Sequence, residues 1–255
     1  LFLDLSFLSD YNKHVEVGYK FNFFFVILFF KKEVIYYMNE LTKLSKIKAY
    51  TKSKLGADKT GHGCDHIKRV VTMAKKILES ESADKLVTLA AAYLHDTIDD
   101  KLVSDPKVAL AELQEFLASL EFTSAQIEEI SFIITHMSFA HSLQDDDFQL
   151  PLSGQIVQDA DWLDAIGAIG ITRAIYYGGH HGEKIYNPAL APRTNMTREE
   201  YRNLDDETII NHFYEKLLKL KDMLNTPTAK KIAEHRQQVM LDFLTEFKNE
   251  WNSLA

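Results

Sequence analysis

Apolar residues recur at helical spacing along most of the chain. In the run 67–78, positions such as Ile67, Val70 and Ala74 lie three or four residues apart, which is the stripe of an amphipathic helix. Residues 85–98 are apolar over most of the helical circumference, which predicts a central, buried helix. No window alternates with a period of two for long enough to propose a strand, so the pattern predicts an all-α protein.

Local capping signals predict where several helices begin. Asp84 stands before the 85–98 run as an N-cap, and Pro106 occupies the first turn of the next helix. Thr123 and Gln126 have the spacing of a capping box. Further helices are expected at 41–55, 106–120, 124–137, 156–169, 201–224 and 228–251.

Residues 1–37 differ from the rest of the chain. The run 21–30 is apolar but has about half the length that a membrane-spanning helix needs, and no signal-peptide cleavage site follows it. Phe, Lys, Ile, Asn and Tyr are the residues that AT-rich non-coding DNA encodes, and the codons from Lys32 onward can contain a ribosome-binding site ahead of Met38. We therefore expect a translated upstream segment followed by one domain, 38–255; an N-terminal appendage or a membrane-surface patch is the alternative.

Net charge and cysteine content narrow the function classes. The formal net charge of −8 is poorly suited to binding a nucleic-acid duplex, whereas a bound cation could still attract a small phosphorylated substrate; no membrane partner is expected. The chain has a single cysteine, which rules out an intrachain disulfide and fits a reducing cytoplasm. Cys64 is expected to be a small buried side chain, with a stray metal ligand as the alternative.

Four side chains suggest a metal site. His66 begins a helix and shares a face with Val70. His95 and Asp96 stand at the end of the apolar run 86–94, where the alternative is a polar C-terminal cap. Asp161 lies on a helix apolar enough to be buried, and a carboxylate there needs a partner. Imidazole and carboxylate together suit one divalent ion, Mn²⁺ or Fe²⁺ above all, with Mg²⁺, Co²⁺, Ni²⁺ or Zn²⁺ also compatible.

These residues resemble the H…HD…D signature of HD-domain phosphohydrolases. The residues that flank His66, His95 and Asp161 are similar to those of small stand-alone bacterial members. The resemblance runs from about Met38 to the C-terminus. The resemblance implies an all-α HD-domain helical bundle, with a core at about 60–170 and a C-terminal helical extension at about 197–252. The family usually has Asp where Gly63 stands and often Arg where Trp162 stands; neither position is a metal ligand.

The resemblance also implies a reaction. Small relatives include nucleoside triphosphate pyrophosphohydrolases, so a (deoxy)nucleoside triphosphate cut to monophosphate and pyrophosphate is the first expectation. Alarmone hydrolysis and 5′-nucleotidase activity are alternatives. A non-catalytic module that senses metal or nucleotide is the alternative from a different class, although the presence of all four ligands favours an enzyme.

Further residues are candidates for catalysis. Asp99 and then Asp100 follow the His95–Asp96 pair and could orient or deprotonate the attacking water, as an acidic pair does in alarmone hydrolases; a solvated acidic helix end is the alternative. Arg69 has the fork geometry to bind a phosphate or to hold a carboxylate such as Asp65.

Several residues are assigned to the substrate. The glycines beside His62 argue against a helix that would aim it at the metal, so it is expected to contact a phosphate, and Lys68 and Lys101 to balance charge. His136 is favoured as a substrate contact or a lone histidine over a second-metal ligand. His180 lies in the stretch 178–193, whose length and lack of periodicity favour a lid. The long C-terminal helices could pair in a homodimer.

Overall fold

The structure is a computed structural model that describes residues 39–56, 63–99, 103–142, 149–193, 197 and 207–254. The chain divides into two compact units, residues 1–45 and 46–255. Of the first unit, residues 39–45 are described and are helical; the helix continues to residue 55 in the second unit. The expectation of a translated upstream segment at 1–37 lies outside the described residues.

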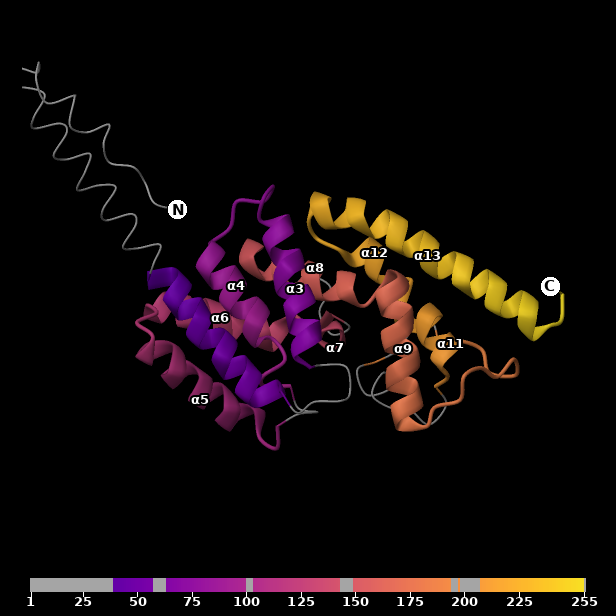
Figure 1. Cartoon of the computed structure of the whole chain (residues 1–255), viewed down its shortest axis with the longest axis horizontal. Helices are drawn as coiled ribbons and strands as arrows, with labels where there is room; N and C mark the ends of the chain where they lie inside the picture. The colour runs from indigo at the N-terminus through magenta and orange to yellow at the C-terminus, as the bar shows by residue number, and fades with distance from the viewer. Residues whose placement is uncertain are drawn as a thin grey trace, which may run out of the picture. The chain divides into compact units, whose positions relative to one another are not determined.

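The second unit is built of helices, which confirms the all-α prediction (Figure 1). The described residues contain one isolated β-bridge, between Lys184 and Thr208, and no named strand. No described helix is both long enough and apolar enough to cross a membrane. The helices are α3 (Cys64–Ile77), α4 (Lys85–Leu94), α5 (Pro106–Ser119), α6 (Ser124–His136), α7 (Phe139–Ser142), α8 (Leu152–Asp164), α9 (Gly167–His181), α11 (Ile209–His212), the π-helix η2 (Phe213–Leu217), α12 (Leu220–Met223) and α13 (Pro227–Trp251).

Two helices, α4 and α8, lie at the centre of the packing. α4 packs against α3, α6 and α8, and every residue from Leu86 to Leu94 except Tyr93 is buried, as the apolar pattern predicts. α8 lies between α3 and α4 on one side and α9 and α13 on the other (Figure 1). α8 therefore connects the N-terminal helices of the unit to its C-terminal helices.

The predicted helix starts agree with the structure. The side chain of Asp84 accepts a hydrogen bond from the backbone N–H of Val87, and Asp105 caps α5 just before Pro106. Thr123 and Gln126 form the capping box of α6. Each of these signals acts within one turn of helix, which is why the sequence alone reveals them.

The helix expected at 85–98 ends earlier, at Leu94. The backbone N–H and the hydroxyl of Thr97 both donate to the carbonyl of Leu94, at 2.9 and 2.7 Å. This carbonyl would otherwise receive the next helical hydrogen bond from Ile98. The chain therefore tightens into a turn over residues 95–98, and His95 and Asp96 lie in that turn rather than in a regular helix.

The helix expected at 156–169 is in fact two helices. α8 begins at Leu152, directly after Pro151, and ends at Asp164; α9 then begins at Gly167. Gly167 has a φ of +76°, a left-handed conformation that interrupts a right-handed helix and that glycine adopts without strain.

The stretch 178–193, expected to be a lid, is partly helical. α9 continues to His181 and ends at Gly182, whose left-handed conformation is a common helix terminator. Beyond it, the backbone N–H groups of Ile209 and Ile210 donate to the carbonyls of Lys184 and Ile185, both at 3.0 Å. These bonds tie residues 184 and 185 to the start of α11.

The single helix expected at 201–224 is also interrupted. Residues 201–206 lie outside the described part, and residues 209–223 form α11, η2 and α12 in succession. The π-turn places Glu215 in the interior, where it is 1% exposed and accepts hydrogen bonds from the backbone N–H and the Nε of Arg193, at 2.9 and 3.0 Å. The helix expected at 228–251 is confirmed as α13, which begins one residue earlier.

Candidate metal centre

Three separate elements position the four candidate ligands. His66 lies in the first turn of α3, and its side chain is buried on the same face as Val70. His95 and Asp96 lie in the turn after α4, and each is 7% exposed. Asp161 lies in the last turn of α8, which packs against both α3 and α4.

The structure brings these four side chains together. Nε2 of His66 lies 3.2 Å from Nε2 of His95, 3.4 Å from Oδ2 of Asp96 and 3.3 Å from Oδ1 of Asp161. Nε2 of His95 lies 3.4 Å from Oδ1 of Asp96 and 3.8 Å from Oδ1 of Asp161. In the described part of the chain, His66, His95 and Asp96 also form the one tight group of three potential ligands, with donor atoms within 4.8 Å of one another.

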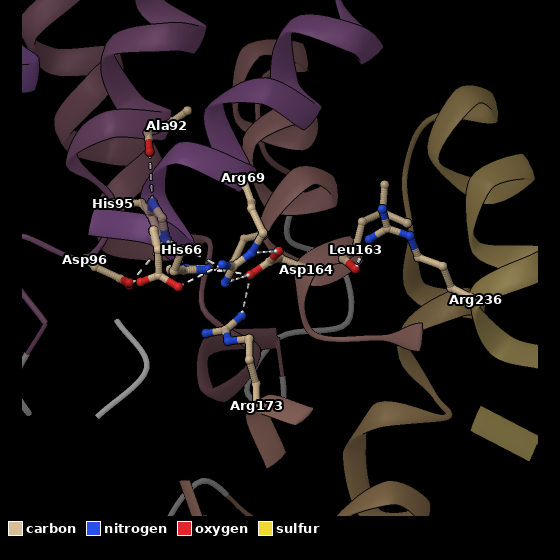
Figure 2. Close-up of polar contacts among 11 residues, drawn as sticks. His66, Arg69, Ala92, His95, Asp96, Leu163, Asp164, Arg173 and Arg236 are labelled. Carbon is tan, nitrogen blue, oxygen red and sulfur yellow. Dashed lines mark hydrogen bonds and ion pairs between the residues drawn. The ribbon is translucent and has the colours of Figure 1, made fainter. Parts of the chain in front are cut away.

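The two imidazoles are oriented by bonds at their other nitrogen. Nδ1 of His66 lies 2.8 Å from Oδ2 of Asp164, and Nδ1 of His95 lies 3.0 Å from the carbonyl of Ala92 (Figure 2). Carboxylates and carbonyls accept hydrogen bonds, so in each neutral ring the proton belongs on Nδ1 and the lone pair of Nε2 faces the cluster. Two such lone pairs and two carboxylates facing one point fit a divalent cation of intermediate hardness.

Asp164 is the hub of the surrounding hydrogen bonds. Nε of Arg69 donates to Oδ1 at 2.7 Å, while Nη2 of Arg69 and Nη1 of Arg173 donate to Oδ2 at 3.0 and 2.9 Å (Figure 2). The second carboxylate on Arg69 is the exposed Asp65, at 2.8 Å from Nη1. Arg69 thus holds carboxylates, one of the two roles that its sequence position left open.

Burial and charge act in opposite directions on these groups. Burial lowers the pKa of His66, but the carboxylates of Asp161 and Asp164 more than offset this, and the pKa rises to about 9. Burial raises the pKa of Asp164, but His66 and Arg69 outweigh it and hold the pKa well below the usual range. Burial likewise raises the pKa of Asp161, and His66 and His95 bring it below its ordinary value. Both aspartates are therefore ionised at neutral pH. With a pKa of about 9, His66 carries a second proton on Nε2 at neutral pH, and a cation bound there would displace that proton and leave the neutral ring described above.

The other predicted site residues fall in different places. Asp99 is half-buried in the turn after Asp96, and its backbone N–H donates to the Asp96 carbonyl at 3.3 Å. Lys68 is exposed on α3. His62, Asp100 and Lys101 lie outside the described residues.

Two further histidines are placed on helix ends. His136 is the last residue of α6, where its ring stacks on Phe132 with centroids 4.4 Å apart and contacts His141 edge-on at 4.8 Å. His180 is exposed in the last turn of α9, beside His181, rather than in a loop.

Two more positions differ from what the sequence suggests. Cys64 is exposed at the start of α3, so the expectation of a buried side chain is wrong. Trp162, where relatives often have arginine, is 3% exposed and meets Phe139 edge-on at 6.4 Å. The tryptophan therefore packs in the core beside the site and takes no part in the cluster of donor atoms.

Sequence reasoning missed Arg173 and the bonds of Asp164 to α3. Asp164 holds His66 and two arginines. The available signal was the placement of Arg173 as the one cation in the otherwise apolar run of α9 before its terminal histidines. Arg173 is half-buried, a cation in that position favours a carboxylate partner, and Asp164 is one.

Comparison with known proteins identifies the family. The HD domain family matches residues 63–166, the part of the chain that holds all four candidate ligands. YpgQ of Bacillus subtilis is 34% identical over 213 residues, which cover 84% of this chain and 96% of YpgQ. This chain belongs to the HD-domain family. The prediction of an HD-domain, metal-dependent hydrolase is thereby confirmed.

Solved structures of similar proteins share this HD fold. A Lactobacillus plantarum protein is 50% identical, with a TM-score of 0.77, over 83% of this chain and 98% of its own. An HD-superfamily hydrolase from Bacillus thuringiensis is 35% identical, with a TM-score of 0.66, over 84% and 98%. The crystal structure of YpgQ in complex with ADP matches at 33% identity and a TM-score of 0.64, over 81% and 97%.

Proposed function

We propose that this HD-family hydrolase holds one divalent ion, preferably Mn²⁺, through His66, His95, Asp96 and Asp161, and that it hydrolyses a nucleotide. The proposed substrate is a ribo- or deoxyribonucleoside triphosphate, cut to the monophosphate and pyrophosphate. The observation that carries the proposal is the convergence of two imidazole nitrogens and two carboxylates within 3.2–3.8 Å around Nε2 of His66 and His95.

The residues of the chain divide the chemical work. When bound, the ion supplies Lewis-acid charge and lowers the pKa of the attacking water. Water adds to the α-phosphorus, the bond from that phosphorus to the bridging oxygen breaks, and pyrophosphate leaves. Asp99, in the turn that also presents Asp96, is the carboxylate that we assign to accept the proton from this water.

Positive side chains beside the cluster offset the charge of the phosphates. The side chains of Arg69 and Arg173 are 33% and 23% exposed, and both lie against Asp164, which in turn bonds a metal-binding histidine. Their charges therefore lie close to where the phosphates would be held. Lys68 precedes Arg69 and is exposed. Its side chain adds a third positive charge, accessible from solvent, that can offset the charge of the phosphates.

The comparison with YpgQ supports a nucleotide. YpgQ has been crystallised with ADP, and this chain is similar to YpgQ over nearly its full length. ADP contains the α–β phosphoanhydride bond, which is the bond that the proposed reaction breaks. An acidic protein with a cationic centre is suited to a small phosphorylated ligand of this kind.

A nucleotide panel tests the proposal. The purified full chain, loaded with Mn²⁺, is assayed against ribo- and deoxyribonucleoside triphosphates, diphosphates, monophosphates and a guanosine tetraphosphate, with phosphate and pyrophosphate measured separately. The expected result is pyrophosphate from triphosphates, lost in Asp96→Ala and retained in Asp222→Asn, an exposed carboxylate on α12. Phosphate from monophosphates would instead indicate a nucleotidase. Metal binding without turnover of any member would indicate a sensor and contradict the proposal.

A further inference from the structure

α13 is attached to α8 at two points, one on each side of Asp161 along α8. The first is Asp159, a carboxylate that is 0% exposed. Its Oδ1 accepts from the backbone N–H and the side-chain amide of Asn225, at 2.8 and 2.9 Å. Its Oδ2 accepts from the backbone N–H and the hydroxyl of Thr226, both at 2.7 Å. Thr226 is the N-cap of α13, so this carboxylate holds the beginning of that helix.

The second point is the carbonyl of Leu163, which accepts a hydrogen bond from Nη1 of Arg236 on α13. Carbonyls in the last turn of a helix lack their usual intrahelical donor, so an external guanidinium satisfies one of them. In Figure 2, Arg236 approaches from one side of Leu163, while Asp164 and His66 lie on the other. The approach is close: a Cβ on Gly167 would lie 3.0 Å from both Cβ and Cγ of Arg236.

The geometry of α8 separates these attachment points from the ligand face. Asp159 and Leu163 are four residues apart and share one face of the helix. Asp161 is two residues beyond Asp159, about 200° further round, so it points away from α13 and toward His66. Two attachments one turn apart on the rear face fix the rotation of α8 about its own axis.

A small rotation of α8 about its axis would move Asp161 out of position for metal binding. A carboxylate about 5 Å from the helix axis moves by about 1 Å when the helix turns by about 10°. Metal–ligand distances tolerate deviations of about 0.2 Å. Asp164 lies on the same helix, so a rotation of α8 would also shift its bond to Nδ1 of His66.

We infer that Arg236 and Asp159 are positioning residues, through which α13 holds α8 at the rotation that places Asp161 and Asp164 for metal binding. Neither residue contacts the proposed ion. This role depends on the metal centre but not on which nucleotide is hydrolysed, so the experiment that tests it contains no nucleotide.

The test measures Mn²⁺ binding by the full chain. Arg236→Met keeps an unbranched stem against Gly167 but removes the donor, Arg236→Lys keeps a donor and the charge, and Asp159→Asn replaces one acceptor oxygen by a donor. Lys231→Met is the control, an exposed cation removed from the same helix. Affinity and ligand geometry come from Mn²⁺ electron paramagnetic resonance, and folding from circular dichroism.

We expect the Mn²⁺ dissociation constant to be about tenfold higher in Arg236→Met and Asp159→Asn, with an altered Mn²⁺ spectrum in both. Arg236→Lys should give an intermediate dissociation constant, and Lys231→Met should bind Mn²⁺ as the wild type does. A merely structural role would lower the melting temperature while leaving affinity and spectrum as in the wild type, and that result overturns the inference. Should Arg236→Met or Asp159→Asn fail to fold, Arg236→Lys decides: weaker binding by a folded variant supports the inference, and wild-type binding overturns it.

Discussion

The turn after α4 and the end of α8 each present metal-binding side chains, but they are held in different ways. His95 is held by the carbonyl of Ala92, three residues earlier, in the helix that precedes its turn. The end of α8 is held by distant residues: Asp164 contacts His66 across 98 positions of sequence, and Leu163 contacts Arg236 across 73. His95 is thus positioned locally, whereas His66 is oriented by a distant carboxylate and Asp161 depends on where α3, α9 and α13 place its helix.

The largest expected effect comes from removing one ligand from each region. His95→Ala and Asp161→Ala should both lose stoichiometric Mn²⁺ binding and turnover, because each deletes one of four convergent donors. The loss should exceed the 10- to 100-fold that follows removal of an outer partner. Metal content of the purified variants and activity with added Mn²⁺ give the measurement. Wild-type affinity in Asp161→Ala would mean that the α8 region is not part of the centre.

The next effect concerns Asp164, which orients a metal-binding histidine without being a metal ligand itself. Asp164→Asn should weaken Mn²⁺ binding by about 10- to 100-fold, because the amide offers one acceptor oxygen where the carboxylate now serves His66, Arg69 and Arg173. Isothermal titration with Mn²⁺ measures it. The matched control is Asp65→Asn, the exposed partner of the same Arg69.

Because the Asp65 side chain is 78% exposed, its pair with Arg69 is screened by water, and the control should bind Mn²⁺ within a factor of three of the wild type. Equal effects in the two variants would show that Arg69 pairing in general, rather than the bond from Asp164 to His66, sets the affinity.

The same distinction explains what the sequence revealed. The caps at Asp84 and Thr123 could be predicted because their signals lie within one turn of helix. The four candidate ligands were proposed from three short segments, around His66, His95 and Asp161, that resemble a family signature. The breaks at Gly167 and at the π-helix around Glu215 were not predicted. A single glycine within an apolar run does not by itself reveal a left-handed backbone, and the burial of Glu215 is balanced by Arg193, a partner 22 positions away.

The hydrogen-bond hub at Asp164 was missed for the same physical reason. A carboxylate three residues after Asp161 could serve several neighbours, and only the packing of α3 against α8 selects His66. The exposure of Cys64 likewise depends on which side of the first turn of α3 packs against the rest of the unit. Tertiary contacts decide which partner a residue binds and which side chains are exposed, and the residue's own sequence neighbours do not reveal those contacts.

A smaller effect tests whether the C-terminal region acts on the centre only through α8. Glu215→Gln removes the nearer of two carboxylates beside Arg193, the other being Glu207 at 3.7 Å from Nη2. It should lower the free energy of unfolding by about 2 kcal/mol, less than for a fully buried pair because the Arg193 side chain is 25% exposed. Urea unfolding of the metal-free protein measures it, with Glu234→Gln, exposed on α13, as the control. Mn²⁺ affinity should remain within twofold of the wild type. A clear loss of affinity would show that η2 also positions the centre.

The smallest effect concerns a purely local device. Thr123→Ala removes the hydroxyl that accepts from the backbone N–H of Gln126, and with it half of the capping box of α6. The expected loss is about 1 kcal/mol in the free energy of unfolding, or about 2–4 °C in melting temperature for a unit of this size. Ser124→Ala, one residue further and also exposed, leaves the cap intact and should melt with the wild type. Thr123 is at the opposite end of α6 from Met137, whose carbonyl accepts a hydrogen bond from Gln158 of α8 at 2.9 Å. Mn²⁺ affinity should therefore not change, and a change would mean that the start of α6 influences the centre through α4 or α8.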